Sequence, residues 1–176
     1  NFFWKYFAEG SVVLGDRLYV LTWTNKVVFV YDPATLEYRS TWSYPREGWG
    51  LTTDGRSLIA SDGSSSLYFM NADLKVLKTL TVTLNGRPLR LLNELEWIDG
   101  KIWANIYTTD SIAVIDPESG KVEALIDCSG LLPEKLRSPD TDVLNGIAVL
   151  GEGNSQRIFL TGKNWPRLYE VRVLKQ

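Results

Sequence analysis

Short apolar runs, separated by tight-turn signals, recur along the whole chain. Four of these runs follow a turn rich in Gly, Asp or Ser, and they read "GDRLYVLTW", "DGRSLIASDG", "DGKIWANIY" and "SQRIFLTGK". A turn of this composition before a β-rich apolar run is typical of a hairpin strand. No sustained helical period occurs, apart from an ambiguous stretch at "LLPEKLRSPD". The pattern therefore predicts an all-β fold.

The four runs repeat at a similar interval. Their matching apolar residues lie roughly 40 to 56 residues apart, at Leu18, Leu58, Ile102 and Ile158, and one four-stranded blade of a β-propeller has about this length. Most of the runs are followed by a second hairpin, in "VVFVYDPATLEYRSTW", "LYFMNADLKVLKTLTV" and "IAVIDPESGKVEALID". We expect residues 1–176 to form a single β-propeller domain with four recognisable blades.

Polar and aromatic residues fall at one end of each predicted blade. In a propeller, the segment that leads into the innermost strand and the loop after the second strand lie on the same face, around the axis. The leading segments contain "FAEG", "EGWG", "LNELEW" and "VLNG", and the loops begin "LTW", "ASDG", "ANIY" and "TGKNW". The residues expected to converge on this face are Glu9, Trp23, Trp49, Asp62, Asn93, Glu94, Asn105, Asn145 and Lys163. An apolar-walled pocket with a few convergent polar groups is the usual form of a small-ligand site.

Glu94 and Glu96 have two interpretations. On one strand they lie about 7 Å apart on the same face, and such a carboxylate pair is suited to general acid–base catalysis. Inner-strand carboxylates more often join neighbouring blades, through hydrogen bonds to backbone groups or to a basic side chain such as Arg87 or Arg90. The sequence leaves both roles open.

Other residues of this face also have a structural alternative. Trp23 and Trp49 either pack within the blades or line the pocket. Lys163 is an isolated lysine between Gly162 and the aromatic–proline corner "NWP", a setting that favours a functional role. Glu9, flanked by small and aromatic residues, is similar.

Composition narrows the chemistry that the chain can perform. With 44% hydrophobic and 23% charged residues, it has the profile of one globular domain with a sizeable core. The net charge of −2 with mixed signs, and the lack of a Lys/Arg cluster or long apolar segment, predict neither nucleic-acid binding nor membrane spanning. The chain has no His and one Cys, Cys128, which excludes the usual zinc sites and His-dependent nucleophiles. We expect Cys128 in the core, and Asp32 and Asp116 as turn formers.

Many of these motifs together resemble the glutamine cyclotransferase family, the plant and bacterial type of glutaminyl cyclase. The resemblance runs from about Tyr6 to Val173 and rests on "FAEG", "LTW", "YPREGWGLTTDG", "SDGSSSLYF", "LNELEW", "GKIWAN", "IDPESGKVEALIDCSGLLP", "VLNGIA" and "TGKNWPRLYEV". It implies a five-bladed β-propeller and an acyltransferase that converts the N-terminal glutamine of a peptide or protein to pyroglutamate and releases ammonia. It also implies no zinc catalyst, no cofactor, and export to the periplasm or outside the cell.

The resemblance assigns roles to individual residues. Glu9 of "FAEG" resembles the carboxylate that shuttles the proton. Asn93 and Lys163 resemble the groups that hold the amide oxygen as its charge develops. The remaining substrate-binding residues that it suggests are Phe7, Trp23, Trp49, Asn105 and Tyr107.

The chain departs from the family pattern at three places. Ala8 stands where the family usually has Gly, and Tyr107 stands where it usually has Trp. The family's first blade, with a site Gln and a site Glu, lies upstream of "YFAEG", where this sequence has only a few residues, and "NFFWKYF" is not a signal peptide. We therefore expect a chain that is truncated at its N-terminus relative to the family. Taken alone it should be self-associated or poorly soluble and nearly inactive, and about 40 further upstream residues should restore it.

Two other functions remain open from the sequence. One is a non-catalytic propeller that binds peptide or protein. The other is a calcium-dependent lactonase-type propeller, in which Glu9, Asn93 and Asn145 surround a metal. Lys163 in such a ring would repel the cation.

Overall fold

The computed structural model describes residues 5–151 and 153–174, and their strands form four antiparallel sheets and one short hairpin. The first sheet contains β1 (Ala8–Leu14), β2 (Arg17–Thr22), β3 (Val27–Tyr31) and β4 (Tyr38–Ser43). The second contains β5 (Leu51–Thr53), β6 (Leu58–Ser61), β7 (Ser66–Met70) and β8 (Val76–Thr81). The third contains β11 (Leu92–Ile98), β12 (Lys101–Ile106), β13 (Ser111–Ile115) and β14 (Val122–Asp127). The fourth contains β15 (Leu144–Leu150), β16 (Arg157–Gly162) and β17 (Tyr169–Val171).

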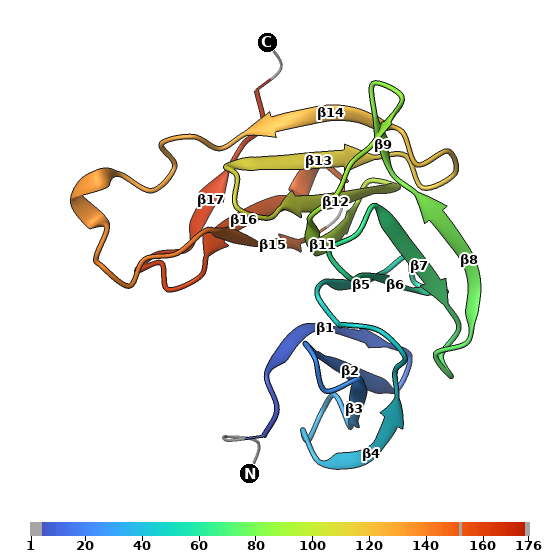
Figure 1. The fold of residues 1–176 in the computed structure, drawn as a ribbon. Helices are drawn as coiled ribbons and strands as arrows, with labels where there is room; N and C mark the ends of the chain where they lie inside the picture. Colours follow the sequence, from blue (N-terminus) through green and yellow to red (C-terminus); the bar gives the residue numbers. More distant parts are fainter. Residues whose placement is uncertain (1–4, 152, 175–176) are drawn as a thin grey trace.

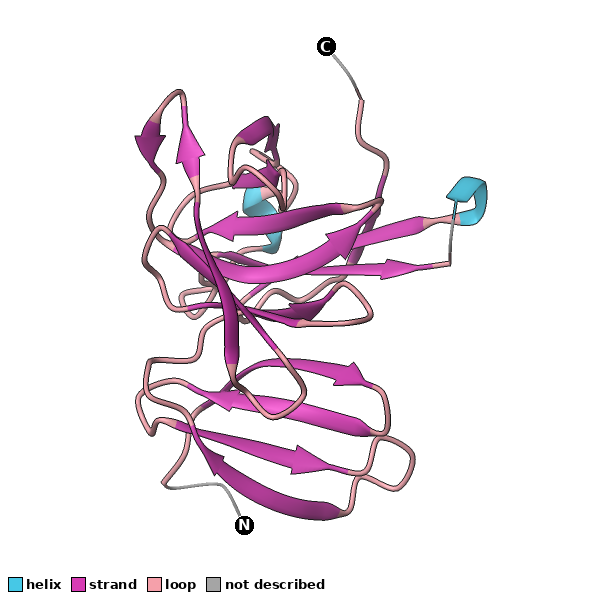
Figure 2. Ribbon diagram, turned by 90° about the vertical axis from the view of Figure 1, so that its right-hand side faces the viewer, coloured by secondary structure: helices cyan, strands magenta, loops and turns pink. Residues whose placement is uncertain are grey.

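Smaller elements connect these sheets. The hairpin consists of β9 (Thr83–Leu84) and β10 (Arg87–Pro88). The ambiguous stretch of the sequence forms only a short 3-10 helix, η1 (Glu134–Leu136), and a second one, η2 (Gly153–Ser155), precedes β16. No helix in the described part of the chain has the length and apolar character needed to cross a membrane. The prediction of an all-β fold is confirmed (Figure 2).

The four sheets follow one another in an arc. Figure 1 shows β1–β4 at the bottom, β5–β8 and β11–β14 along the right and top, and β15–β17 on the left. The first strand of each sheet contacts the first strand of the next, so that β1 meets β5, β5 meets β11, and β11 meets β15. This is the arrangement of propeller blades around an axis, with β1, β5, β11 and β15 as inner strands. The four predicted blades are confirmed, and the fourth has three strands among the described residues.

Each hydrophobic core lies between two adjacent sheets. Strand β6 shows how, because successive side chains of a strand point to opposite faces. Leu58 and Ala60 belong to the core shared with the first sheet, whereas Ile59 belongs to the core shared with the third. All three are fully buried. A third core between the last two sheets contains Cys128, whose burial raises its pKa to about 11.

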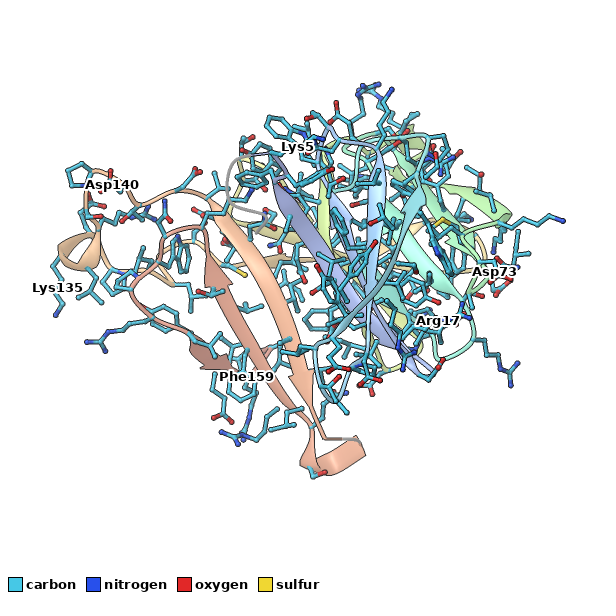
Figure 3. The ribbon with its side chains drawn as sticks, turned by 90° about the horizontal axis from the view of Figure 1, so that it is seen from below. Lys5, Arg17, Asp73, Lys135, Asp140 and Phe159 are labelled. Carbon is cyan, nitrogen blue, oxygen red and sulfur yellow. The ribbon has the colours of Figure 1, made fainter. Side chains whose placement is uncertain are left out.

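Polar contacts at the surface fix turns and neighbouring sheets. The Asp32 carboxylate accepts the backbone N–H of Thr35, and Asp116 accepts that of Ser119, which confirms both as turn formers. Arg17 of β2 lies 3.5 Å from Asp73 in the turn between β7 and β8, and the two labelled side chains approach each other in Figure 3.

Two carboxylates of β11 join the third sheet to the fourth. Glu94 accepts the backbone N–H of Ile147 at 2.9 Å, and Glu96 accepts that of Val149 at 3.1 Å. The structure therefore favours the joining role for this pair, through backbone groups of β15. Burial raises the pKa of both carboxyls, and the neighbouring charge of Glu96 helps to raise that of Glu94 to about 8.

Candidate functional site

Four aromatic side chains, contributed by three sheets, meet in two edge-to-face pairs. Phe7, just before β1, and Trp23, just after β2, have ring centroids 6.1 Å apart. Trp49, before β5, and Tyr107, after β12, have centroids 5.5 Å apart. Such pairs attract one another beyond the apolar area that they bury. These are four of the residues that the sequence suggested for substrate binding.

A carboxylate and an ammonium group link the two pairs. Glu47 Oε2 accepts the indole N–H of Trp23 and that of Trp49, each at 3.0 Å. On the other side, Lys163 Nζ lies 6.0 Å from the centroid of Phe7 and 5.7 Å from that of Tyr107, within the range of cation–π attraction. Each of these side chains thus contacts the next, and the last contacts the first. We call this ring of six side chains the aromatic circuit, and its members are Phe7, Trp23, Glu47, Trp49, Tyr107 and Lys163.

Glu9 lies beside this circuit. Its Oε1 is 3.8 Å from Lys163 Nζ, and its side chain is 17% exposed. Burial raises the pKa of Glu9, while the positive charge of Lys163 opposes that rise. The first and fourth sheets thus supply a carboxyl and an ammonium group at one place. A partly buried carboxyl next to a cation is suited to accept and return a proton.

A β-bulge recurs where the first, third and fourth inner strands begin. In each, two residues of the inner strand face one residue of the neighbouring strand, which breaks the regular pairing. Bulges bend a strand and re-aim its side chains. The paired bulge residues are Glu9–Gly10, Asn93–Glu94 and Asn145–Gly146. The polar residues predicted to face the site therefore lie where the strand departs from its alternating pattern.

Two glycines make the close approaches that this geometry requires. A Cβ atom on Gly10 would lie 2.5 Å from the backbone nitrogen of Leu51, and Gly10 donates its own N–H to Trp49 O at 2.8 Å. A Cβ on Gly63 would lie 2.7 Å from the Trp49 ring, and the φ of Gly63 is +77°. The ring of Trp49 therefore packs directly against the backbone of Gly63.

The asparagines predicted for the site lie deeper than the aromatic side chains. Asn93 is 4% exposed, and its backbone oxygen accepts the hydroxyl of Ser61. Asn105 is fully buried, and its Oδ1 accepts the N–H of Gly146. Asn105 Nδ2 and Asn145 Oδ1 are buried without a hydrogen-bond partner among the described residues. Direct contact of Asn93 or Asn105 with a substrate stays a prediction.

Two findings change the set of residues that the sequence suggested. Asp62 accepts hydrogen bonds from Ser64 and from the hydroxyl of Tyr68, so it braces its own hairpin. Glu47 was not singled out, although it stands two residues before Trp49 in "EGWG". An acidic residue so close to a predicted wall tryptophan was the available signal. Among the described residues, no group of three or more His, Cys, Asp or Glu side chains is arranged to hold a metal ion.

Comparison with known proteins identifies the family. A sequence model described as glutamine cyclotransferase matches residues 2–173, nearly the whole chain. The chain belongs to the glutamine cyclotransferase family. A glutaminyl-peptide cyclotransferase from Arabidopsis thaliana is 43% identical over 172 residues, which are 96% of this chain and 53% of the relative. The chain thus spans about half the length of this curated relative.

Solved structures agree with this membership. A crystal structure of glutaminyl cyclase from Myxococcus xanthus superposes with a TM-score of 0.87 and 41% identity, over 97% of this chain and 74% of that chain. Hydrazine synthase from Kuenenia stuttgartiensis, at 16% identity and a TM-score of 0.54, covers 91% of this chain and 46% of its own, and shares the fold alone. The aromatic circuit and Glu9 are therefore taken as the candidate site of this family member.

Proposed function

We propose that this protein converts the N-terminal glutamine of a peptide or protein substrate to pyroglutamate and releases ammonia. The observation that carries the proposal is the Glu9–Lys163 pair beside the aromatic circuit, in a chain of the glutamine cyclotransferase family. The relatives from Arabidopsis and Myxococcus bear names of this activity.

Glu9 would move the proton. In the reaction the α-amine nitrogen forms a bond to the γ-amide carbon, and it must lose one proton. The bond from that carbon to the amide nitrogen breaks, and the nitrogen leaves as ammonia after gaining one proton. One carboxyl group that accepts the first proton and delivers it to the leaving nitrogen serves both steps. The raised pKa of Glu9 brings this carboxyl closer to neutral pH, where such a shuttle works best.

Lys163 would stabilise the amide oxygen. During attack this oxygen gains negative charge, and a fixed positive group nearby stabilises it more in the transition state than in the substrate. The Lys163 side chain is 31% exposed, so it can meet a ligand while its backbone is held by hydrogen bonds to Val143 and Asp142. Asn93 is proposed as a second group that orients the substrate amide.

The aromatic circuit would orient the glutamine side chain and exclude water. Water at the γ-carbon would hydrolyse the amide to glutamate instead of allowing ring closure. Trp23 and Phe7 are 44% and 58% exposed, so apolar surface remains free to cover a ligand. Because the substrate is an extended peptide with a reactive N-terminus, this open position of the aromatic side chains suits the proposed reaction.

The test uses the chain extended by the upstream segment of about 40 residues, because the chain alone is expected to be nearly inactive. It compares a peptide that begins with glutamine and the same peptide with its α-amine acetylated. The proposal predicts ammonia release, with loss of the mass of one ammonia, from the free peptide and none from the acetylated one, which has no nucleophile. Ammonia from both peptides would indicate a hydrolase, and ammonia from neither would contradict the proposal. Parallel reactions with a chelator and with a lactone substrate separate this activity from a calcium-dependent lactonase.

We also infer that the protein works in the periplasm or outside the cell. The support is the resemblance to exported family members. Fractionation of the source cells tests this location, and recovery of the protein only from the cytoplasm would contradict it.

A further inference from the structure

We propose that Glu47 is a positioning residue, which fixes the two tryptophans of the aromatic circuit by accepting both indole N–H groups on one carboxylate oxygen. This inference rests on the proposed function of the site. Trp23 lies in the loop just after β2 of the first sheet, and Trp49 in the segment that leads into the second. Glu47 is thus the joint between the two aromatic pairs.

The geometry explains why one residue can hold both tryptophans. The two indole nitrogens lie 3.0 Å from the same oxygen, Oε2. A carboxylate oxygen has two lone pairs and can accept two donors, and hydrogen bonds to a charged acceptor are stronger than those to a neutral one. Trp49 is also seated on Gly63 and meets Tyr107, whereas Trp23 is 44% exposed. We therefore expect Trp23 to depend on Glu47 more than Trp49 does.

The same geometry occupies only one of the two carboxylate oxygens. Both lone pairs of Oε2 accept indole donors, so a proton from an amine could reach Glu47 only at Oε1, and a substitution must separate positioning from proton transfer. A glutamine at this position would keep a carbonyl oxygen with two lone pairs and could accept both indoles, but it could neither carry charge nor exchange a proton. Glu47→Gln therefore separates the two roles, because only positioning survives this substitution.

The kinetic test compares Glu47→Ala with Glu47→Gln. Misplaced walls reduce the fraction of bound glutamine that is aligned for attack, so Glu47→Ala should lower kcat/KM by roughly 10- to 100-fold. Glu47→Gln should recover most of this loss and stay within about threefold of the wild type, since a neutral acceptor makes weaker hydrogen bonds. Glu37→Ala, in the exposed turn before β4, is the matched control for removal of a glutamate side chain.

A second measurement does not depend on turnover. NMR signals of the indole N–H groups of Trp23 and Trp49, assigned with Trp23→Phe and Trp49→Phe, report the hydrogen bonds directly. Both signals should move and exchange faster with water in Glu47→Ala, and both should stay close to their wild-type positions in Glu47→Gln. An inactive wild-type protein would contradict the proposed function but would leave this link measurable.

Three outcomes would overturn the positioning role. Equal loss of activity in Glu47→Gln and Glu47→Ala would show that the charge is needed. Unchanged kcat/KM in Glu47→Ala would show that the hydrogen bonds between Glu47 and the two tryptophans do not contribute to activity. Unchanged indole signals in Glu47→Ala would show that the hydrogen bonds do not form in solution. If Glu47→Ala fails to fold, the Glu47→Gln kinetics and indole signals still decide, because loss of either would contradict the proposal.

Discussion

At the scale of single residues, the proposed chemistry depends on how burial and charge balance at Glu9. Burial raises the pKa of this carboxyl because the ionised form is poorly solvated, and Lys163, 3.8 Å away, opposes that rise by favouring the ionised form. The balance leaves a carboxyl that ionises above its ordinary range but still below the value that burial alone would give. Lys163 thus has a second effect besides its proposed contact with the amide oxygen.

Replacing Lys163 by Met tests both effects. The stem packing is largely retained and the positive charge is lost, so kcat should fall by roughly 10- to 1,000-fold. The pKa of Glu9 should rise, and the acid limb of the kcat/KM profile, where Glu9 loses its basic form, should move to higher pH. A pH profile of kcat/KM measures the shift. Lys135→Met is the control, because Figure 3 shows Lys135 at the outer edge of the molecule. An unmoved acid limb in Lys163→Met would contradict the assignment of that limb to Glu9.

The sequence predicted most of the aromatic circuit but not Glu47, which joins its two tryptophans. Trp23 and Trp49 were predicted both from the blade pattern and from the family resemblance, whereas Phe7 and Tyr107 were suggested by the resemblance alone. Glu47 belongs to the same face, but its role depends on two indole nitrogens from different sheets reaching one oxygen. The short spacing of Glu47 and Trp49 was a local signal for one of these bonds, but the bond to Trp23 spans 24 residues and has no local sequence signature.

At the scale of elements, the contact between β11 and β15 depends on two carboxyls that accept backbone N–H groups. These bonds satisfy inner-strand N–H groups of β15 that regular pairing would leave open, which gives the two acidic residues of β11 a structural role. This arrangement also destabilises the folded protein by an amount that depends on pH. Glu94 is poorly solvated and lies near the charge of Glu96, so the folded protein resists its ionisation.

The pH dependence of stability tests this account of Glu94. In the unfolded chain Glu94 loses its proton near its ordinary pKa of 4.5, whereas in the folded protein it does so at about 8. Over this interval the unfolded state binds fewer protons, so the free energy of unfolding should fall as pH rises from about 5 to about 8. Glu94→Gln keeps an acceptor for Ile147 and cannot ionise, so its stability relative to the wild type should increase over the same range.

Denaturant unfolding of both proteins at several pH values provides the measurement. Glu118→Gln, in the exposed turn between β13 and β14, should follow the wild type throughout. A difference between Glu94→Gln and the wild type that stays constant with pH would contradict the raised pKa.

The strands themselves were predictable, and the irregularities within them were not. Alternating apolar residues and Asp- or Gly-containing turns are local signals, so β2, β6, β12 and β16 fall where the pattern predicted them. The bulges at Glu9–Gly10 and Asn93–Glu94 depend on register with a neighbouring strand, which the sequence does not state. These bulges nevertheless set the direction of the candidate site residues Glu9 and Asn93.

At the scale of the whole molecule, the inter-sheet cores make adjacent blades interdependent. Leu58 and Ile59 are neighbours on β6, yet they pack in different cores. A substitution that disrupts one core therefore removes the packing on one face of a strand that two cores share. This sharing is the physical basis for expecting a single domain, although the blades are separate sheets.

Leu58→Ala tests that interdependence. Removal of this fully buried side chain should lower the free energy of unfolding by about 2 to 5 kcal/mol. Tryptophan fluorescence and far-ultraviolet circular dichroism should shift together, because the sheets unfold as one unit. Leu58→Met, which nearly conserves volume, should cost less than about 1.5 kcal/mol. Two separated transitions would indicate blades that unfold independently.

The central claim is that Glu9 carries the proton for glutamine cyclisation at a site assembled by all four sheets. The most direct measurement uses the chain extended by the upstream segment of about 40 residues. Ammonia release from a glutamine-initiated peptide is compared for the wild type, Glu9→Gln and the surface control Glu37→Gln, with unfolding temperatures recorded for each. We predict that Glu9→Gln stays folded and loses a factor of roughly 10² to 10⁴ in kcat, the usual contribution of general acid–base catalysis, while the control keeps its activity. A folded Glu9→Gln variant with near wild-type turnover would contradict the account.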